Sequence, residues 1–205
     1  VMTTVYITRH GQTVWNIEYR FQGQKDSELT EKGIEQAKLL SERMKDAHID
    51  CIYASPLKRT METAKIIRGN RDIDIIEEEG FKELSFGDYE GRTKDELKLE
   101  GKGEEISKIF AYEEDAKAPN GESLKELYNR VSKTLDKLLK KEKGKTIFIV
   151  THGAALLAIY KYFSENNEYY PEVMGQTSLT KVVDDGEGFK FQYINNDEHL
   201  KSHMI

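Results

Sequence analysis

Apolar and polar positions alternate along the chain with two different periods, which predicts strands that alternate with helices. Short apolar, β-rich segments predict buried strands at residues 5–8, 51–54, 73–76 and 147–150. After the first of them, apolar residues recur at the helical spacing of Ile34, Ala37, Leu40 and Met44. Two further apolar segments, 178–183 and 189–194, flank the polar turn 184–188, and together they predict a hairpin.

Capping signals indicate where several of the helices begin. Residues 93–96 and 123–126 each have the capping-box pattern, in which a hydroxyl residue is followed three positions later by glutamate. The second box opens a long helix, and its apolar face comprises Leu124, Leu127, Val131, Leu135 and Leu138. Ser55 and Pro56 predict another start, with Ser55 as the N-cap and Pro56 at the first helical position. A further helix is expected over residues 154–163.

The alternation of strands and helices implies one α/β domain over residues 1–205, a three-layer sandwich whose mostly parallel sheet is flanked by helices. The closing hairpin is expected to add an antiparallel edge to this sheet. Residues 92–121 differ from the rest because they are rich in Lys and Glu and weakly apolar, and they end in an Ala-Pro-Asn-Gly loop. We expect this segment to be a helical insertion that forms a lid over the site.

Composition narrows the class of protein and its partners. The chain has 38% hydrophobic and 33% charged residues, a composition typical of globular proteins. Its net charge is −6, and an acidic protein binds nucleic acids and anionic membranes poorly, so we expect neither as a partner. No apolar run approaches the ~20 residues that a membrane-spanning helix needs. A single cysteine, Cys51, excludes an intrachain disulfide and fits a reducing compartment. We therefore expect a cytoplasmic protein without a signal peptide.

Two predicted strands end in nearly the same way, with Thr8-Arg9-His10-Gly11 and Val150-Thr151-His152-Gly153. In a parallel α/β sheet, ligands bind beyond the carboxyl ends of the strands, so both histidines are expected at that edge. An imidazole there can act as a nucleophile, a base, a hydrogen-bond donor or a metal ligand. For either histidine alone, an ordinary structural role is the simpler interpretation. Because the two occupy matching positions at strand ends, we favour a role in catalysis or binding for both.

A zinc site is the next alternative, because histidine is a common zinc ligand. Such a site needs further His, Cys or carboxylate ligands at close spacing. The remaining histidines, His48, His199 and His203, lie at a helix end or in the C-terminal tail and do not offer that spacing. We therefore expect neither a metal ion nor another cofactor.

Arginines near the same edge indicate an anionic ligand. Arg9 directly precedes His10, and Arg59 lies in the first turn of the helix that Ser55 and Pro56 are expected to open. Guanidinium groups match phosphate oxygens bidentately, and burying Arg9 at a strand end without an anion would be costly. Glu83, by composition alone, is one of many glutamates.

The ordered set of motifs along the chain resembles the histidine phosphatase superfamily, which has the phosphoglycerate-mutase-like fold. The motifs that carry this resemblance are Arg9-His10-Gly11-Gln12-Thr13, Trp15-Asn16, Phe21-Gln22-Gly23, Leu29-Thr30-Glu31-Lys32-Gly33, Ser55-Pro56-Leu57-Lys58-Arg59, Thr63-Ala64, Glu83, Gly87-Asp88-Tyr89-Glu90-Gly91, Thr151-His152-Gly153 and Asn196-Asp197-Glu198-His199-Leu200. They cover nearly the whole chain in order, which makes the set far more specific than the Arg-His-Gly triplet alone.

The resemblance also implies roles for individual residues. It implies that His10 is the nucleophile that becomes phosphorylated and that Glu83 donates a proton to the leaving group. The residues that it implies for contacts with the phosphoryl group are Arg9, Asn16, Gln22, Arg59, His152 and Gly153. A protonated His152 and the two arginines would then stabilise the transition state without a metal ion.

Within the family, the chain looks like the phosphatase branch, particularly its broad-specificity and alpha-ribazole-type members. Residues 83–91 resemble that branch, Gln24-Lys25 follow where mutases usually carry a tryptophan, and the chain is short for a mutase. A cofactor-dependent phosphoglycerate mutase remains the alternative, and a catalytically silent phosphoanion-binding regulatory protein is an alternative of another class. The expected partner is a small-molecule phosphate ester. A homodimer is also compatible with the sequence, because either edge strand of the sheet could pair with a second copy of the chain.

Overall fold

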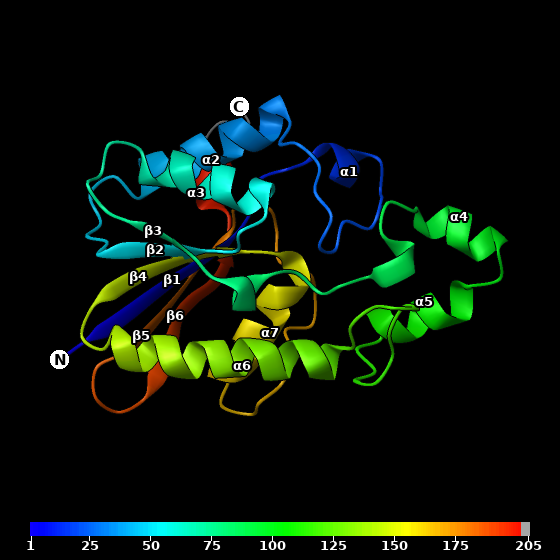
Figure 1. Cartoon of the computed structure of the whole chain (residues 1–205). Coiled ribbons are helices and arrows are strands. Elements are labelled where there is room, and N and C mark those ends of the chain that lie inside the picture. Colours follow the sequence, from blue (N-terminus) through cyan, green and yellow to red (C-terminus); the bar gives the residue numbers. More distant parts are fainter. Residues whose placement is uncertain (202–205) are drawn as a thin grey trace.

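The computed structural model describes residues 1–201, so His203 and the rest of the C-terminal tail lie outside the described residues. Its centre is a six-stranded sheet with the strand order β3-β2-β4-β1-β5-β6 (Figure 1). The strands are β1 (Thr3–Arg9), β2 (Cys51–Ala54), β3 (Ile75–Glu77), β4 (Thr146–Thr151), β5 (Leu179–Asp184) and β6 (Phe189–Asn196). The first four run parallel, while β5 pairs with β1 and β6 in antiparallel fashion. The expected hairpin and mostly parallel sheet are both confirmed.

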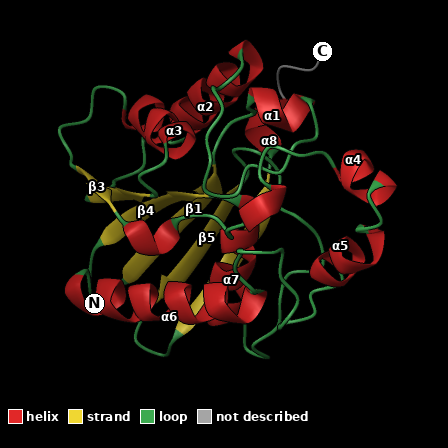
Figure 2. Ribbon diagram, turned by 45° about the vertical axis from the view of Figure 1, so that its right-hand side comes forward, coloured by secondary structure: helices red, strands yellow, loops and turns green. Residues whose placement is uncertain are grey.

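Helices cover both faces of this sheet, which confirms the three-layer sandwich (Figure 2). On one face lie α2 (Glu31–Arg43), α3 (Lys58–Arg68) and the short α8 (Glu198–Lys201). On the other lie α6 (Leu124–Lys141) and α7 (Gly153–Phe163). None of the helices among residues 1–201 is both long and apolar enough to cross a membrane.

The core follows from the alternation of side chains along the strands. In β1, Val5 and Ile7 face the cluster under α6 and α7, while Tyr6 faces the cluster under α2 and α3. The apolar face expected for α6 is buried throughout. Each fully buried side chain of this size contributes ~1.5–3 kcal/mol to stability, so these two clusters fix the register of the central strands.

The start of α3 differs from the sequence-based prediction. The helix begins at Lys58 rather than at Pro56, and its N-cap residue, Leu57, has no side-chain cap. Instead, the carboxylate of Asp26 accepts a hydrogen bond of 2.8 Å from the backbone N–H of Lys58. The Ser55 hydroxyl, which was expected to cap the helix, lies 2.8 Å from Nε2 of His152. The helix is therefore capped by a carboxylate from a distant loop, Asp26, instead of by the nearby Ser55 side chain.

The segment expected to form a lid contains two helices, α4 (Lys94–Leu99) and α5 (Gly103–Phe110). They lie beyond the sandwich, on the side where the parallel strands have their carboxyl ends (Figure 1). The expected capping box at the start of α4 is present, as is that of α6. Leu97, Ile106 and Ala118 of this segment form a small apolar cluster with Tyr89. Phe21 and Phe86 pack against this cluster, and Phe86 also packs against the main core. It is therefore held together largely by side chains outside the main core.

Short helical turns connect these elements around the same end of the sheet. They are α1 (Val14–Ile17) and two 3₁₀ turns, Glu79–Phe81 and Gly87–Tyr89. Strand β3 starts two residues later than expected, because Ile73 lies in the preceding loop.

Candidate active site

The two histidines meet because β1 and β4 are parallel neighbours in register. Arg9 pairs with Thr151, so the following residues, His10 and His152, leave the sheet side by side. Their ring centroids are 5.4 Å apart, with an angle of 63° between the ring planes. Gly11 makes the turn after His10 possible, because a Cβ there would lie 2.4 Å from the carbonyl oxygen of Gly33.

His10 is buried, with 2% of its surface exposed, and its ring orientation is fixed by one hydrogen bond. Its Nδ1 lies 2.7 Å from the carbonyl oxygen of Gly11. A carbonyl oxygen can only accept, so Nδ1 carries the proton and Nε2 keeps its lone pair. Burial, with the positive charges of Arg59 and Arg9, lowers the pKa of His10 well below its usual value. The ring is therefore neutral at pH 7, as a nucleophile requires.

His152 lies beside it, fully buried, and was expected to be protonated. Burial is again the main reason that the pKa of His152 lies well below its usual value, and the charges of Arg59 and Arg9 add to it. In this arrangement the ring is neutral, and a phosphate dianion next to it would favour protonation. Its Nδ1 is buried without a hydrogen-bond partner, which fits a site built for a polar ligand.

Arg9 also keeps unused hydrogen-bonding capacity. Its Nη1 donates to the carbonyl oxygen of Met174 at 3.1 Å, while its buried Nε has no partner. Burial lowers the pKa of the Arg9 guanidinium, and the charge of Glu83 opposes this. The group nevertheless stays charged at pH 7. A cation with a buried, unpaired N–H is consistent with the anionic ligand expected here.

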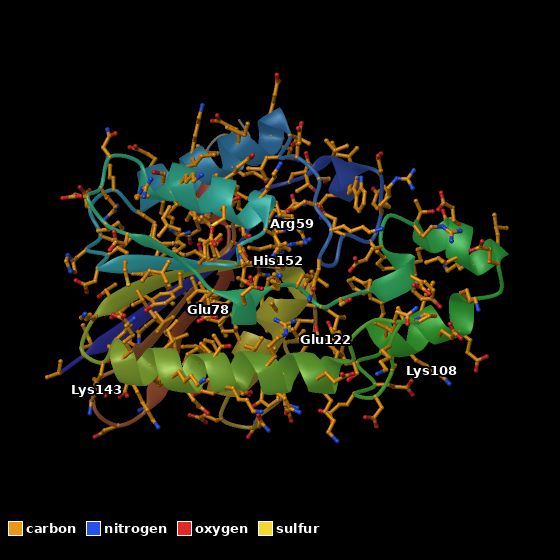
Figure 3. The ribbon with its side chains drawn as sticks, viewed as in Figure 1. Arg59, Glu78, Lys108, Glu122, Lys143 and His152 are labelled. Atoms are coloured by element: carbon orange, nitrogen blue, oxygen red, sulfur yellow. The ribbon has the colours of Figure 1, made fainter. Side chains whose placement is uncertain are left out.

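Arg59 lines the same cavity, and Figure 3 shows it close to His152, but most of its hydrogen bonds are made within the protein. Its side chain is 1% exposed and pairs with Asp26 at 2.8 Å. It also donates to the carbonyl oxygens of Gly23 and Lys25, both at 2.5 Å. These bonds leave Nε, which is buried and unpartnered. Arg59 thus both supplies positive charge and fixes the loop that carries Gln22.

The two expected amides are brought to this cavity as well. The side-chain oxygen of Asn16 accepts from the backbone N–H of Thr13 at 2.9 Å. That of Gln22 accepts from the Thr13 hydroxyl at 2.8 Å. Because both oxygens are used as acceptors, each side chain offers its NH₂ group, a hydrogen-bond donor, to the cavity. Gly153 lies in the cavity wall at the first residue of α7.

The carboxylate of Glu83 lies at the start of α7 and lines the same cavity. Its Oε2 accepts from the backbone N–H of Ala154 at 3.0 Å, and its Oε1 from Leu84 and Ala155 at 2.8 and 2.9 Å. Each of these N–H groups can only donate, so both carboxyl oxygens act here as acceptors. Glu83 can donate a proton to a leaving group only in its protonated form.

The sequence analysis did not identify Asp26 as a site residue, and it gave Ser55 a different role, that of a helix N-cap. Asp26, which pairs with Arg59, and Ser55, which contacts His152, carry polar roles that no local pattern indicated. The rest of the cavity is mostly apolar, and this wall includes Phe21, Phe86, Phe110, Tyr112, Leu157 and Val173. Within residues 1–201, there is no group of three or more His, Cys, Asp or Glu side chains arranged to hold a metal ion.

Comparisons with known proteins identify the family of this chain. The model of the histidine phosphatase superfamily (branch 1) matches residues 5–197. The chain belongs to this superfamily. Among its curated relatives is the "probable phosphoglycerate mutase GpmB" of Enterobacter sp. (strain 638), which is 43% identical over 155 residues, or 76% of this chain and 72% of the relative.

Solved structures of the superfamily share the fold over nearly the whole chain. Bacillus stearothermophilus YhfR is 35% identical, with a TM-score of 0.88 over 97% of this chain and 99% of that one. The alpha-ribazole phosphatase from Shigella flexneri is 25% identical, with a TM-score of 0.84 over 95% and 96% of the two chains. The names of these histidine phosphatase relatives thus include both a phosphatase and a mutase.

Proposed function

We propose that this protein is a cytoplasmic phosphomonoesterase that hydrolyses small phosphate esters through a phosphohistidine on His10, without a metal ion. The observation that carries the proposal is the hydrogen bond from His10 Nδ1 to the Gly11 carbonyl, which leaves Nε2 as the nucleophilic atom. The lowered pKa of His10 supports it, because the ring is neutral and ready to attack.

In the first step, the Nε2 lone pair of His10 attacks phosphorus and the phosphorus–oxygen ester bond breaks in line. Glu83 gives its proton to the departing oxygen, so that the leaving group departs as an alcohol or phenol. A phosphate monoanion that enters the site is a source of that proton, since the Glu83 oxygens act as acceptors in this arrangement. Arg9, Arg59 and His152 stabilise charge on the equatorial oxygens.

In the second step, water attacks the phosphohistidine. Glu83, now a carboxylate, takes a proton from the water as its oxygen bonds to phosphorus. The phosphorus–nitrogen bond breaks and its electron pair returns to Nε2 of His10. The products are inorganic phosphate, which takes the proton back from Glu83, and the neutral imidazole from which the cycle began.

The apolar wall of the cavity favours esters whose leaving group is aromatic or otherwise apolar. Besides Arg9 and Arg59, Arg20 is the further cationic residue in the cavity wall, and it lies 3.5 Å from Glu18 and 3.6 Å from Glu96. A carboxylate on the leaving group would compete with these two glutamates for Arg20. This arrangement favours a phosphatase over an enzyme that handles phosphoglycerate.

Trapping the phosphoenzyme tests the proposal directly. With a ³²P-labelled aryl phosphate, wild-type protein quenched in alkali should carry an acid-labile label on His10. His10→Ala should lose the label, and its kcat should fall on the order of 10³-fold or more. His48→Ala, at an exposed residue, is the matched control and should behave as wild type. Activity should also persist in EDTA, and a label on another residue would refute the mechanism.

A phosphoglycerate mutase remains the second candidate, because the curated relative above carries that name. A mutase excludes water and passes the phosphoryl group to a second phosphorylated substrate. Labelled enzyme offered phosphoglycerate separates the two reactions, since label in inorganic phosphate indicates a phosphatase and label in a bisphosphorylated product a mutase. A single burst of phosphate without further turnover would instead indicate the catalytically silent regulatory protein.

A further inference from the structure

Arg130, on the middle of α6, uses every N–H of its guanidinium on one short segment and one carboxylate. Its Nη1 donates to the carbonyl oxygens of Gly80 and Lys82 at 3.0 and 2.9 Å. Its Nη2 donates to the carbonyl oxygen of Glu83 at 3.3 Å. The remaining two N–H groups bind Glu122, through Nε at 3.0 Å and Nη2 at 2.7 Å.

These contacts differ from those of an ordinary surface ion pair. The Arg130 and Glu122 side chains are only 24% and 16% exposed, and Figure 3 shows Glu122 at the end of α6 that lies toward the α4–α5 segment. The bidentate pair holds the guanidinium plane at a fixed angle. That plane then contacts three backbone carbonyls within residues 80–83, which a flexible surface arginine would not do.

The segment that Arg130 holds ends at the proposed general acid. Residues 80–83 also pack closely on α6, because a Cβ on Gly80 would lie 1.8 Å from the Thr134 hydroxyl oxygen. The backbone position of Glu83 determines where its carboxyl group lies relative to the start of α7. A displacement of ~1 Å at such a group is enough to reduce catalysis substantially.

We propose that Arg130, oriented by Glu122, is a positioning residue that holds the backbone of Glu83 so that its carboxyl group reaches the leaving oxygen. This inference rests on the proposed function, because it gives Glu83 the role of proton donor. Arg130 does not line the cavity. Its hydrogen bonds act on the backbone of Glu83, while its positive charge is one of several that lower the pKa of His152, and the Arg130→Lys variant keeps that charge.

The dependence of rate on the leaving group distinguishes this role from a general contribution to stability. An ester such as phenyl phosphate needs a proton on its leaving oxygen, whereas 2,4-dinitrophenyl phosphate releases a weakly basic phenolate and does not. Loss of a general acid costs ~10²–10⁴-fold for the first class. A variant that misplaces the acid should therefore slow phenyl phosphate much more than the dinitrophenyl ester.

The experiment measures single-turnover release of phenol and dinitrophenol by wild type, Glu83→Gln, Arg130→Gln and the double variant. For Arg130→Gln we expect a fall of ~30-fold with phenyl phosphate and less than ~3-fold with the dinitrophenyl ester. The double variant should be no slower than Glu83→Gln, because both changes act on the same proton transfer. Arg130→Lys keeps the charge but can make fewer hydrogen bonds. Its rate with phenyl phosphate should lie between those of wild type and Arg130→Gln.

The matched control is Leu138→Ala, a core change on the same helix. It should lower the melting temperature without changing the ratio of the two rates. Equal losses for both esters in Arg130→Gln, while Glu83→Gln discriminates between them, would overturn the positioning role and leave the proposed function intact. If Glu83→Gln itself did not discriminate, the acid assigned in the proposed function would be wrong and the inference would fall with it.

Discussion

At His10, burial and two neighbouring cations keep the imidazole neutral, and one hydrogen bond defines its tautomer. The carbonyl of Gly11 orients the ring, and the arginines disfavour a proton on it. Neither effect requires a change of conformation when substrate arrives. The same cations that would stabilise the transition state thus also prepare the nucleophile.

The lowered pKa values of His10 and His152 predict a loss of stability in mild acid. The unfolded chain protonates each histidine near pH ~6.5, while the folded chain keeps both rings neutral to a lower pH. The free energy of unfolding should therefore fall as the pH drops below ~6.5, by up to ~1.4 kcal/mol per pH unit for each histidine, until the folded-state pKa is reached. Urea denaturation across this range measures the slope.

Carboxylates titrate in part of the same range, so the comparison is made with variants. His152→Gln removes one of the two titrating rings, and its stability should fall less steeply with pH than that of wild type. Leu138→Ala, a core change that removes no titrating group, should lower the stability at every pH and keep the wild-type slope. Equal slopes for wild type and His152→Gln would contradict the lowered pKa.

At the scale of single elements, α3 shows how one side chain can serve both a helix and the site. Asp26 caps the helix through Lys58 and pairs with the buried Arg59. Asp26→Ala should therefore destabilise the protein by ~2–4 kcal/mol, because it removes a cap and leaves a buried cation without its partner. Thermal unfolding measures the change. The control is Asp88→Ala, at an exposed aspartate that accepts a hydrogen bond from Asn120. If Asp26→Ala destabilised the protein as little as Asp88→Ala, the double role of Asp26 would be wrong.

The elements also show what the sequence could predict. The apolar face of α6, its capping box and the strand ends at His10 and His152 depend on local patterns, so their positions were predicted correctly. The cap of α3 could not be predicted, because Asp26 is remote from Lys58 along the chain. The direction of the Arg59 guanidinium, toward the loop of residues 23–26, depends on tertiary packing in the same way.

For the whole molecule, the separate apolar cluster of the α4–α5 segment predicts local rather than global opening. Leu97 is 1% exposed within that cluster. Leu97→Ala should cost ~2–5 kcal/mol of packing energy there. We expect amide hydrogen exchange to accelerate across residues 93–118, while the central strands keep wild-type protection. Faster exchange in β1 and β4 as well would show that the segment and the sandwich unfold together. Val182→Ala, in the main core, is the comparison variant, because it should accelerate exchange in the central strands.

Strand β4 lies between β1 and β2, although it follows both of them late in the chain. A growing polypeptide that has left the ribosome only as far as α6 therefore has a gap in the middle of its sheet, and it lacks His152. Catalytic competence cannot accumulate gradually during synthesis, since it arises when one late strand inserts between two early ones. Recovery of activity on refolding should accordingly report the closing of the sheet's centre.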